Sequence, residues 1–480
     1  MKYEPVIGLE VHIELATQSK MFCSCSAGYF GAKPNTHTCP ICLGMPGAMP
    51  KANMTAIKYT QMIAIALHCE NLLNSKFDRK NYFYPDLAKG FQVSQYDLPF
   101  SKKGTISIEV NSQKKAIGIT RAHLEEDTGK LTHTEIKDKK VSLIDFNRSG
   151  VPLIEIVTDP DMTSSEEAKT YAQKLQQIVR YLGVSGCDME KGSMRIEPNV
   201  SLRKPGQKNL PQYKVELKNI NSFRFAQKAI EYEISRQAEI LDRGETPLQE
   251  TRGWDEAKNL TVSQRSKEEA HDYRYFPEPD LPPYVFKQKY IDDIKSEMPE
   301  LPDEKAARFQ SQYQLSHYDC QLLTTDFNLA NFFEEAVKAY PKGEPKRIAN
   351  WTVGELLRRL NEEQKSIETV DLLPASLAEL LLLVDEGRIT TASAKEVFVK
   401  MITSGKSVQD LVKELGAEAI TEEKLAEVIE HIIKTNEKAV GEYKAGKQQT
   451  LGYLIGQVRL QTGGRADPGK LKEILIEKLR

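Results

Sequence analysis

The chain has 480 residues, enough for about three domains at roughly 150 residues each. Lys and Arg total 66 against 68 Asp and Glu, so the formal net charge is −2. This charge excludes a protein that binds nucleic acid over its whole surface. Apolar residues make up 40% and charged residues 28%, which excludes collagen-like and disordered classes. The apolar run Leu380–Val384 is far shorter than the ~18–20 residues of a membrane helix. No signal-peptide pattern opens the chain, so we expect a cytoplasmic protein with no membrane contact.

The first predicted element is a strand from Ile7 to Leu15, in which apolar and polar residues alternate. Period-two alternation places Glu10, His12 and Glu14 on one face, with successive side chains ~7 Å apart. Two carboxylates and an imidazole suit a hard divalent ion such as Mg²⁺ or Mn²⁺. On spacing alone, however, a solvated polar face is the commoner outcome.

Four cysteines follow this strand: Cys23, Cys25, Cys39 and Cys42. Two close cysteine pairs separated by a loop are typical ligands of a structural zinc ion, which takes four tetrahedral ligands. A protein without an export signal meets a reducing environment, which favours metal binding over disulfides. Four unliganded thiols in a loop are the alternative interpretation. Four thiolates leave no open coordination position, so the predicted zinc ion would be structural and not catalytic.

A second polar face is expected on a strand at 117–125. There the alternation places Arg121, His123 and Glu125 side by side, and two further acids follow at once. This set offers the same carboxylate and imidazole donors as the first strand, and a solvated face is again the alternative.

Polar residues also interrupt an apolar stretch from Leu143 to Val157, where strands are expected at 141–146 and 153–158. Charges in such surroundings tend to be paired or functional. A single buried arginine–carboxylate bridge is the alternative. The residues concerned are Asp145, Asn147, Arg148 and Glu155.

Helices and further strands complete this half of the chain. The capping-box pattern Thr163–Glu166 opens a helix that should end before Gly183. The expected strand Met194–Arg203 contains Pro198, whose missing N–H predicts an edge strand or a bulge. Strands with one apolar and one polar face usually form antiparallel sheets, so an antiparallel sheet is expected. The remaining elements are a strand at 213–218 and a helix from Asn221 to Arg243.

A proline-rich segment at 277–283 marks a domain boundary, and beyond about residue 295 only helices are expected. The predicted fold class is therefore α+β, with an N-terminal domain at 1–293, a helical domain at 294–405 and a helical tail at 406–480. The clearest helices are expected at 374–386, 393–403, 422–434 and 468–479.

The end of the chain is basic. Residues 443–480 hold eight Lys or Arg and three Asp or Glu, a net charge of +5. Basic side chains here would meet phosphates and release counterions, although an ordinary basic helical surface is the alternative. The candidates are Lys444, Lys447, Arg459 and Arg465.

Several long, irregular motifs occur in order along the chain. They are Ile7–Leu15, Asn81–Leu87, His123–Asp127, Leu143–Val157, Val215–Phe223 and Asp272–Pro283. Through them the chain resembles, over essentially its whole length, the B subunits of aspartyl/glutamyl-tRNA(Asn/Gln) amidotransferases. It has no phosphate-loop, dinucleotide-loop or nucleophile-elbow motif that would indicate another enzyme class.

The resemblance implies a cradle-shaped N-terminal domain built on an antiparallel sheet, then an all-helical domain and a small helical tail that meets the elbow of tRNA. It implies a heterotrimer in which the partners are an amidase and a small third protein. This subunit of the ligase would hold misacylated Glu-tRNA(Gln) or Asp-tRNA(Asn) and activate the side-chain carboxylate with ATP and Mg²⁺. Ammonia released from glutamine by the amidase would then form the amide.

The resemblance also implies residue roles. Glu10, His12 and Glu125 would hold magnesium, and Lys80 would contact ATP phosphates. The four cysteines would bind zinc, and the basic residues of the tail would bind tRNA. The residues implied to hold ATP or the aminoacyl end are Arg195, Glu197, Asn199, Lys218, Asn147, Arg148 and Glu155.

A non-catalytic, zinc-stabilised scaffold that docks tRNA beside an amidase is the alternative function. A scaffold has no need of Glu10, His12 and Glu125 at one point, whereas an enzyme that phosphorylates a carboxylate does. The geometry of these three residues therefore discriminates between the two hypotheses.

Overall fold

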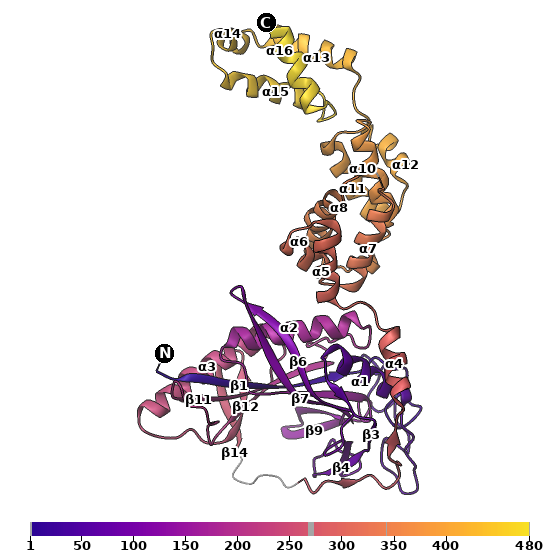
Figure 1. Ribbon diagram of the computed structural model, residues 1–480, viewed down its shortest axis with the longest axis vertical. Coiled ribbons are helices and arrows are strands. Elements are labelled where there is room, and N and C mark those ends of the chain that lie inside the picture. The colour runs from indigo at the N-terminus through magenta and orange to yellow at the C-terminus, as the bar shows by residue number, and fades with distance from the viewer. Residues whose placement is uncertain (1, 267–272, 342, 480) are drawn as a thin grey trace. The chain divides into compact units, whose positions relative to one another are not determined.

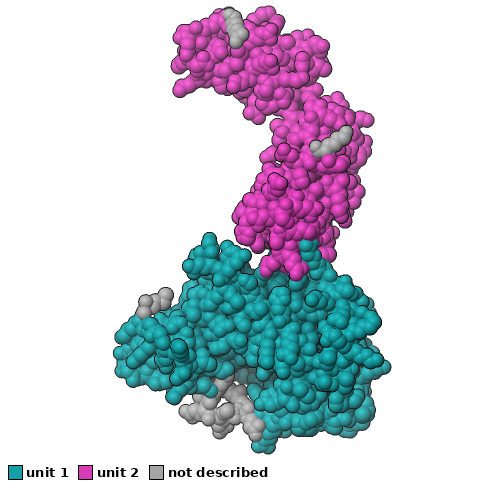
Figure 2. All heavy atoms as spheres, in the orientation of Figure 1, with its two compact units in different colours: residues 1–301 teal, residues 302–480 magenta. Residues whose placement is uncertain are grey.

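The computed structural model describes residues 2–266, 273–341 and 343–479. The chain divides into two compact units, Met1–Leu301 and Pro302–Arg480 (Figures 1 and 2). The first unit carries the strands, and no strand follows Val285 in the described residues. The α+β class, with a sheet followed by helices, is confirmed.

The first unit is built on one large sheet and three small ones. The large sheet has the order β14-β13-β12-β11-β1-β10-β7-β6-β2, so β1 is its middle strand. All its pairs are antiparallel except β12 with β13, which are parallel. The strands are β1 (Glu4–Glu14), β2 (Glu70–Asn71), β3 (Asn74–Ser75), β4 (Asp78–Asn81), β5 (Phe91–Ser94), β6 (Ser101–Val110), β7 (Gln113–Glu126), β8 (Lys130–Ile136), β9 (Lys139–Asp145), β10 (Pro152–Thr158), β11 (Met194–Arg203), β12 (Val215–Lys218), β13 (Glu250–Asp255), β14 (Leu260–Ser266), β15 (Phe276–Pro277) and β16 (Tyr284–Val285).

Helices cover one face of the large sheet (Figure 1). The apolar side chains of β1, such as Leu9 and Val11, are fully buried in one core with Tyr171 and Leu175 of a helix. Alternation therefore turns the polar side chains of β1 toward the opposite face of the sheet. The helices of this unit are α1 (Met54–Ala66), α2 (Ser165–Tyr181), α3 (Phe223–Asp242) and α4 (Gln288–Glu297).

Two local predictions are corrected. Pro198 lies neither at an edge nor in a bulge, because β11 runs between β1 and β12 with an unbroken register against β1. The recorded pairing of β11 with β12 stops at Asn199, beside the residue that has no N–H to donate. The capping residue of α2 is Ser164, one position later than predicted. Its hydroxyl accepts from the N–H of Glu167, whose carboxylate accepts in turn from the N–H of Thr163.

The second unit is entirely helical in the described residues. None of its helices, nor any other helix in the described part of the chain, is both long and apolar enough to cross a membrane. Its helices are α5 (Pro302–Tyr313), α6 (His317–Leu323), α7 (Phe327–Lys338), α8 (Pro345–Trp351), a π-helical segment (Thr352–Leu357), α9 (Arg358–Glu362), a 3₁₀ turn (Ile367–Thr369), α10 (Pro374–Asp385), α11 (Thr391–Ser404), α12 (Val408–Glu414), α13 (Glu422–Thr435), α14 (Glu437–Lys444), α15 (Gln449–Gln461) and α16 (Pro468–Leu479).

The unit boundaries differ from the predicted domain limits. The first unit extends past residue 293 to Leu301, because Ile294 of α4 is buried in its core. Within the second unit, α12 packs against α10 and α11, whereas α13, α15 and α16 share a separate apolar core. The predicted division near residue 405, inside the second unit, stays a prediction.

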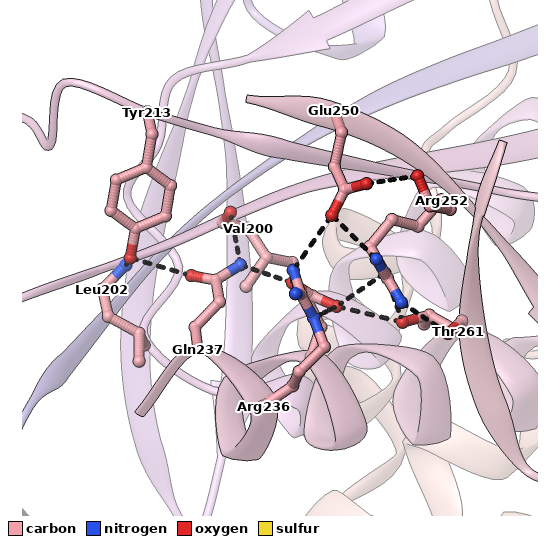
Figure 3. A network of polar contacts seen from close by, with 10 residues as sticks. Val200, Leu202, Tyr213, Arg236, Gln237, Glu250, Arg252 and Thr261 are labelled. Atoms are coloured by element: carbon pink, nitrogen blue, oxygen red, sulfur yellow. Dashed lines mark hydrogen bonds and ion pairs between the residues drawn. The ribbon is translucent and has the colours of Figure 1, made fainter. Parts of the chain in front are cut away.

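A buried ionic network joins α3 to the edge of the large sheet (Figure 3). Glu233 of α3 is fully buried and accepts hydrogen bonds from Arg236 at 2.6 Å and Gln237 at 2.8 Å. The Arg252 guanidinium on β13 approaches the same carboxylate at 3.6 Å, and Glu250 pairs with Arg252 at 2.7 Å. Two acids therefore compensate two guanidinium groups inside the fold.

The network continues toward the middle of the sheet. The Tyr213 hydroxyl donates to the side-chain oxygen of Gln237 at 3.0 Å and accepts from the backbone N–H of Leu202 at 3.1 Å. Between the adjacent strands β13 and β12, the Thr251 hydroxyl donates to the Glu216 carboxylate at 2.8 Å. The network thus fixes β11, β12 and β13 relative to α3.

We expect Glu233→Ala to destabilise the first unit by about 3–5 kcal/mol, because the variant leaves two largely buried guanidinium groups, 19% and 13% exposed, short of a partner. The measurement is urea unfolding followed by fluorescence of Trp254, in a Trp351→Phe background that removes the other tryptophan. The exposed Glu239 on the same helix supplies the control, and Glu239→Ala should change stability by less than about 0.5 kcal/mol. Equal effects of the two substitutions would contradict this account of the network.

Candidate active site

The polar face of β1 lies in the middle of the large sheet, where neighbouring strands add further polar side chains. His12 lies opposite Glu155 of β10 and Arg195 of β11. Glu10 lies opposite Glu197, and the next strand places His123 opposite Glu155. The hypothesis of a solvated polar face is wrong here, since Glu155 is 6% exposed and His123 2% exposed.

The first group on this face contains His12, Glu125 and Glu155, whose ligand atoms all lie within 4.8 Å of one another. His12 Nε2 is 3.3 Å from a Glu155 oxygen and 3.8 Å from a Glu125 oxygen. His123 Nε2 approaches the same two carboxylates at 3.5 and 3.8 Å, and the Ser94 hydroxyl donates to Glu125 at 3.0 Å. Six ligands at ~2.1 Å around a divalent ion lie about 3–4 Å apart, so a small contraction would bring these donors to coordination distance.

Charges around this group keep its carboxylates ionised. Burial raises the pKa of Glu155, but the charge of His123 and the hydrogen bond from His12 hold it well below the ordinary value. Burial likewise opposes ionisation of Glu125, and the hydrogen bond from His123 with the charge of Lys80 lowers its pKa. Burial alone would lower the pKa of His12. The hydrogen bond to Glu155 and the charges of the neighbouring carboxylates outweigh burial and raise this pKa to about 9. The imidazole of His12 and the two carboxylates therefore attract one another across the site.

Lys80 of β4 belongs to the surroundings of this group. Burial alone would lower the pKa of its ammonium. The charges of Glu125 and Glu155 outweigh burial and raise this pKa above its ordinary value. The Lys80 ammonium lies 5.1 Å from the ring centroid of Tyr273 and 5.9 Å from that of Tyr82. These aromatic rings hold the ammonium close to the two carboxylates.

Glu10 belongs to a second group, with Glu197 and Glu216, whose ligand atoms also lie within 4.8 Å of one another. Burial and the charges of nearby carboxylates raise the pKa of Glu10. Lys218 is the ammonium that compensates the group, at 2.9 Å from Glu197 and 3.5 Å from Glu216. The Asn199 amide donates to Glu10 at 3.0 Å. The charge of Lys214 also acts on Glu10, and the three carboxylates form an oxygen-rich set that fits a hard cation.

A cavity of about 310 Å³ adjoins the second group. Glu10 and Asn199 form part of its wall, and the buried Oδ1 of Asn199 accepts no hydrogen bond in the described part of the chain. Its remaining lining is largely apolar or backbone, with Tyr213 held in place by the α3 network. The other lining residues are Val6, Gly8, Leu9, Val157, Thr158, Pro160, Ser201, Leu210, Pro211, Gln212, Lys214 and Gln249.

A third group lies at the end of β1. The Arg195 guanidinium contacts Asp127 at 2.5 Å, and Arg148 approaches the same carboxylate at 3.6 Å. The Tyr29 hydroxyl donates to Glu14 at 2.9 Å. Burial and the charge of Asp127 raise the pKa of Glu14 to about 8. Here the compensating groups are guanidinium groups, whereas the second group uses the ammonium of Lys218.

The four cysteines come together as predicted. The Sγ atoms of Cys23, Cys25, Cys39 and Cys42 all lie within 4.8 Å of one another, and the predicted pairing of two short segments across a loop is confirmed. Cys42 is buried, and hydrogen bonds from Cys23 and Cys39 with the charge of Lys20 lower its pKa to about 5. A tetrathiolate set of this kind fits a zinc ion and leaves no position for substrate.

The four candidate basic residues of the tail are exposed, but two of them have contacts within the protein. Lys447 pairs with Glu442 at 3.0 Å. Arg465 donates to the carbonyls of Thr462 at 3.1 Å and Gly416 at 3.3 Å, so its guanidinium fixes a turn of its own fold. The other two candidates, Lys444 and Arg459, lie on α14 and α15.

Comparison with known proteins agrees with this arrangement. A family model described as the GatB/GatE catalytic domain matches residues 5–292, and a model described as the GatB domain matches residues 331–479. The B subunit of an aspartyl/glutamyl-tRNA(Asn/Gln) amidotransferase from Carboxydothermus hydrogenoformans is 50% identical over 480 residues, which covers 100% of this chain and 99% of the relative.

The chain belongs to the family of amidotransferase B subunits. Proteins with the same name from Thermoanaerobacter pseudethanolicus and a Thermotoga strain are 49% and 48% identical. The match covers 100% of this chain in both cases, and 100% and 99% of the respective relatives. The first unit therefore corresponds to the part of the family described as catalytic.

The structure distributes the predicted site residues in a way that the sequence did not indicate. The predicted magnesium ligands fall into two groups, with His12 and Glu125 in one and Glu10 in the other. Glu155, predicted to hold substrate, lies beside His12 and Glu125. Glu216 was not predicted at all, although it alternates with Lys218 on the same face of a predicted strand. Asp272, which opens one of the motifs, lies outside the described residues.

Asn147 and Arg148 lie apart from the first two groups. Asn147 is fully buried, and both ends of its amide bond the backbone of the cysteine loop, at Lys33 and His37. Arg148 faces Asp127 in the third group, which agrees with the alternative of a buried arginine–carboxylate bridge.

Proposed function

We propose that this chain activates the side-chain carboxylate of a misacylated tRNA with ATP and Mg²⁺ and receives ammonia to form the amide, within a heterotrimer with an amidase and a small third protein. The observation that carries the proposal is the pair of adjacent acidic groups, His12/Glu125/Glu155 and Glu10/Glu197/Glu216, on one buried sheet face beside a cavity. The family membership supplies the reaction class.

Both groups fit divalent cations. The all-carboxylate group of Glu10 suits Mg²⁺, and the group of His12 suits Mn²⁺ or Mg²⁺ with an imidazole among its donors. Cations held there would neutralise phosphate charge and align the attacking and leaving oxygens. Lys80 and Lys218, each already drawn to carboxylates, would turn to the phosphates as the cations compensate those acids.

The cavity beside Glu10 would hold the nucleoside of ATP. Its volume of about 310 Å³ lies at the lower end of the range of small-molecule sites. The free Oδ1 of Asn199 would accept a hydrogen bond from a ribose hydroxyl or the base. Lys214 in the cavity wall adds a positive charge.

The reaction balances with these parts. An oxygen of the substrate carboxylate attacks the γ-phosphorus, the bond from phosphorus to the bridging oxygen breaks, and ADP leaves. Ammonia then attacks the acyl carbon, the bond to the phosphate oxygen breaks, and phosphate and a proton depart. A carboxylate is already a nucleophile, so the chain needs only to position the reactants and exclude water.

The remaining parts have supporting roles in this proposal. The four cysteines would hold a structural zinc ion, and the basic tail would bind the tRNA backbone. A protein of translation with these substrates would act in the cytoplasm. Arg195 would orient the aminoacyl end beside His12, which lies opposite it in the sheet.

Glu125→Gln keeps the size of the side chain but removes its charge, so we expect loss of amidation with the heterotrimer still assembled. The measurement is conversion of tRNA-bound Glu to Gln, and of Asp to Asn, with ADP release, using the purified complex. Glu135→Gln on the exposed hairpin strand β8 is the matched control and should keep full activity. Full activity of Glu125→Gln would refute the metal assignment. A wild-type complex that binds both tRNAs but amidates neither would instead support the scaffold.

Val157→Phe should fill part of the cavity and raise the KM for ATP by about tenfold, which corresponds to ~1.4 kcal/mol of lost binding. The KM for the misacylated tRNA should stay unchanged, because the cavity would hold only the nucleoside. Val262→Phe on β14, where the side chain is 45% exposed and does not line the cavity, is the control. An unchanged KM for ATP in the Val157 variant would place the nucleoside elsewhere.

Lys444→Ala and Arg459→Ala should each weaken tRNA binding and reduce the slope of log K against log[salt] by about 1, since each removes one phosphate contact. Fluorescence anisotropy with labelled tRNA at several salt concentrations measures both effects. The exposed Lys413 on α12 serves as control through Lys413→Ala. Slopes equal to that of the wild-type complex would mean that neither residue meets a phosphate.

A further inference from the structure

Lys20 is a fully buried lysine beside the cysteine group. Its ammonium donates to the His37 carbonyl at 2.7 Å, to the Phe146 carbonyl at 3.3 Å and to Cys42 Sγ at 3.7 Å. No ion pair joins it to a carboxylate in the described residues. Glu126, an acid close to Gly150 in this region, is paired with Lys89.

A buried ammonium needs an anionic partner, and the thiolates are the group that can supply one. Four thiolates around one divalent cation carry two net negative charges, which burial would penalise. The Lys20 ammonium offsets one of them. Of the four cysteines only Cys42 is buried, so the hydrogen bond from Lys20 to Cys42 Sγ joins the buried ammonium to the most buried thiolate of the site.

The same cysteine loop clamps the turn that precedes β10. The Asn35 side chain accepts from the Phe146 N–H at 2.8 Å and donates to the Ile144 carbonyl at 3.1 Å. The Asn147 amide accepts from the His37 N–H and donates to the Lys33 carbonyl, each at 2.7 Å. The Asn147 N–H donates within the turn itself, to Asp145 at 3.0 Å, whereas both ends of its side-chain amide are held by the loop.

The turn leads directly to the third polar group. The Ser149 hydroxyl donates to the Cys42 carbonyl at 3.1 Å, and the Gly150 N–H donates to the Asp127 carbonyl at 2.8 Å. Gly150 has a φ of +86°, and a Cβ added there would lie 3.5 Å from Cys42 and 3.6 Å from Lys20. At this φ any larger residue would be strained, and Gly150 lets the turn keep its place against the cysteine loop.

We propose that Lys20 and Asn147 are positioning residues that couple the four-cysteine metal site to the Arg148–Asp127 pair. Lys20 supplies the charge that retains the metal, and Asn147 transmits the position of the loaded loop to the turn that carries Arg148. Asp127 in turn fixes Arg195, which lies opposite His12. A role of Arg195 in catalysis rests on the proposed function, whereas the coupling of the cysteine site to the Arg148–Asp127 pair does not.

The first test measures zinc retention in the purified complex. We expect Lys20→Met to release zinc to a competing chelator about 10- to 100-fold faster than the wild-type chain, as for other residues that bond a metal ligand. Lys33→Met is the matched control, because Lys33 lies in the same loop with an exposed side chain and contributes only its carbonyl. Equal release rates for the two variants would overturn the role of Lys20.

The second test uses the wild-type chain, so it does not depend on a variant that folds. Zinc is removed with a chelator, and hydrogen exchange is compared before and after removal in peptides that cover 144–151 and helix α3. We expect faster exchange at 144–151 and no change in α3. Unchanged exchange at 144–151 would overturn the coupling. Neither test requires tRNA, ATP or an active enzyme, so failure of the proposed function would not affect the outcome.

Discussion

The buried polar face of β1 is the constraint on which the rest of the first unit depends. β1 is the middle strand of a nine-stranded sheet, so its charged side chains lie far from either edge of the sheet. Each charge therefore needs a partner on a neighbouring strand. The partners differ along the strand. At Glu14 and Asp127 the compensating charges are guanidinium groups, whereas at Glu10, Glu197 and Glu216 they are the ammonium groups of Lys218 and Lys214. Glu10 lines the cavity in which we propose that the nucleoside binds.

Two structures outside this face hold it from opposite ends. The α3 network fixes β11 through Leu202 and β12 through Glu216, and so sets the strands that carry the second group. The cysteine loop fixes the turn before β10 and, through Asp127, the end of β7. Both supports use buried charges that are compensated locally. Geometry of this kind is rigid, because a small shift would leave a desolvated charge without its partner.

Much of the fold could be predicted from periodicity. The alternation indicated the faces of β1 and β11 and the bounds of β11, although β1 begins three residues earlier than predicted. Glycines correctly indicated where α2 and α3 end. Pro198 was misplaced because the rule for proline concerns the missing N–H, and in β11 that position falls where the pairing with β12 ends. The parallel pairing of β12 with β13 could not be predicted either, since it depends on the path of the chain around α3.

The site was harder to predict than the fold because strand order decides it. Alternation along one strand correctly placed Glu10 and His12 on one face, but it could not indicate that their nearest carboxylates come from different strands. His12 meets Glu155 across β10, whereas Glu10 meets Glu197 and Glu216 across β11 and β12. Lys20 was overlooked because it lies among polar loop residues, and nothing in its sequence context indicates a fully buried ammonium.

The energetics of the acidic groups also bear on the choice between enzyme and scaffold. Each ionised group taken from water into the sheet costs several kcal/mol, which the attraction of Lys218 and Lys214 must offset. Burial, with the charges of neighbouring carboxylates, raises the pKa of Glu10. A sheet that only had to support tRNA would avoid this cost with neutral side chains at Glu10, Glu197 and Glu216. On the proposed function, cations that arrive with a nucleotide would offset the cost, and the site would be most stable when loaded.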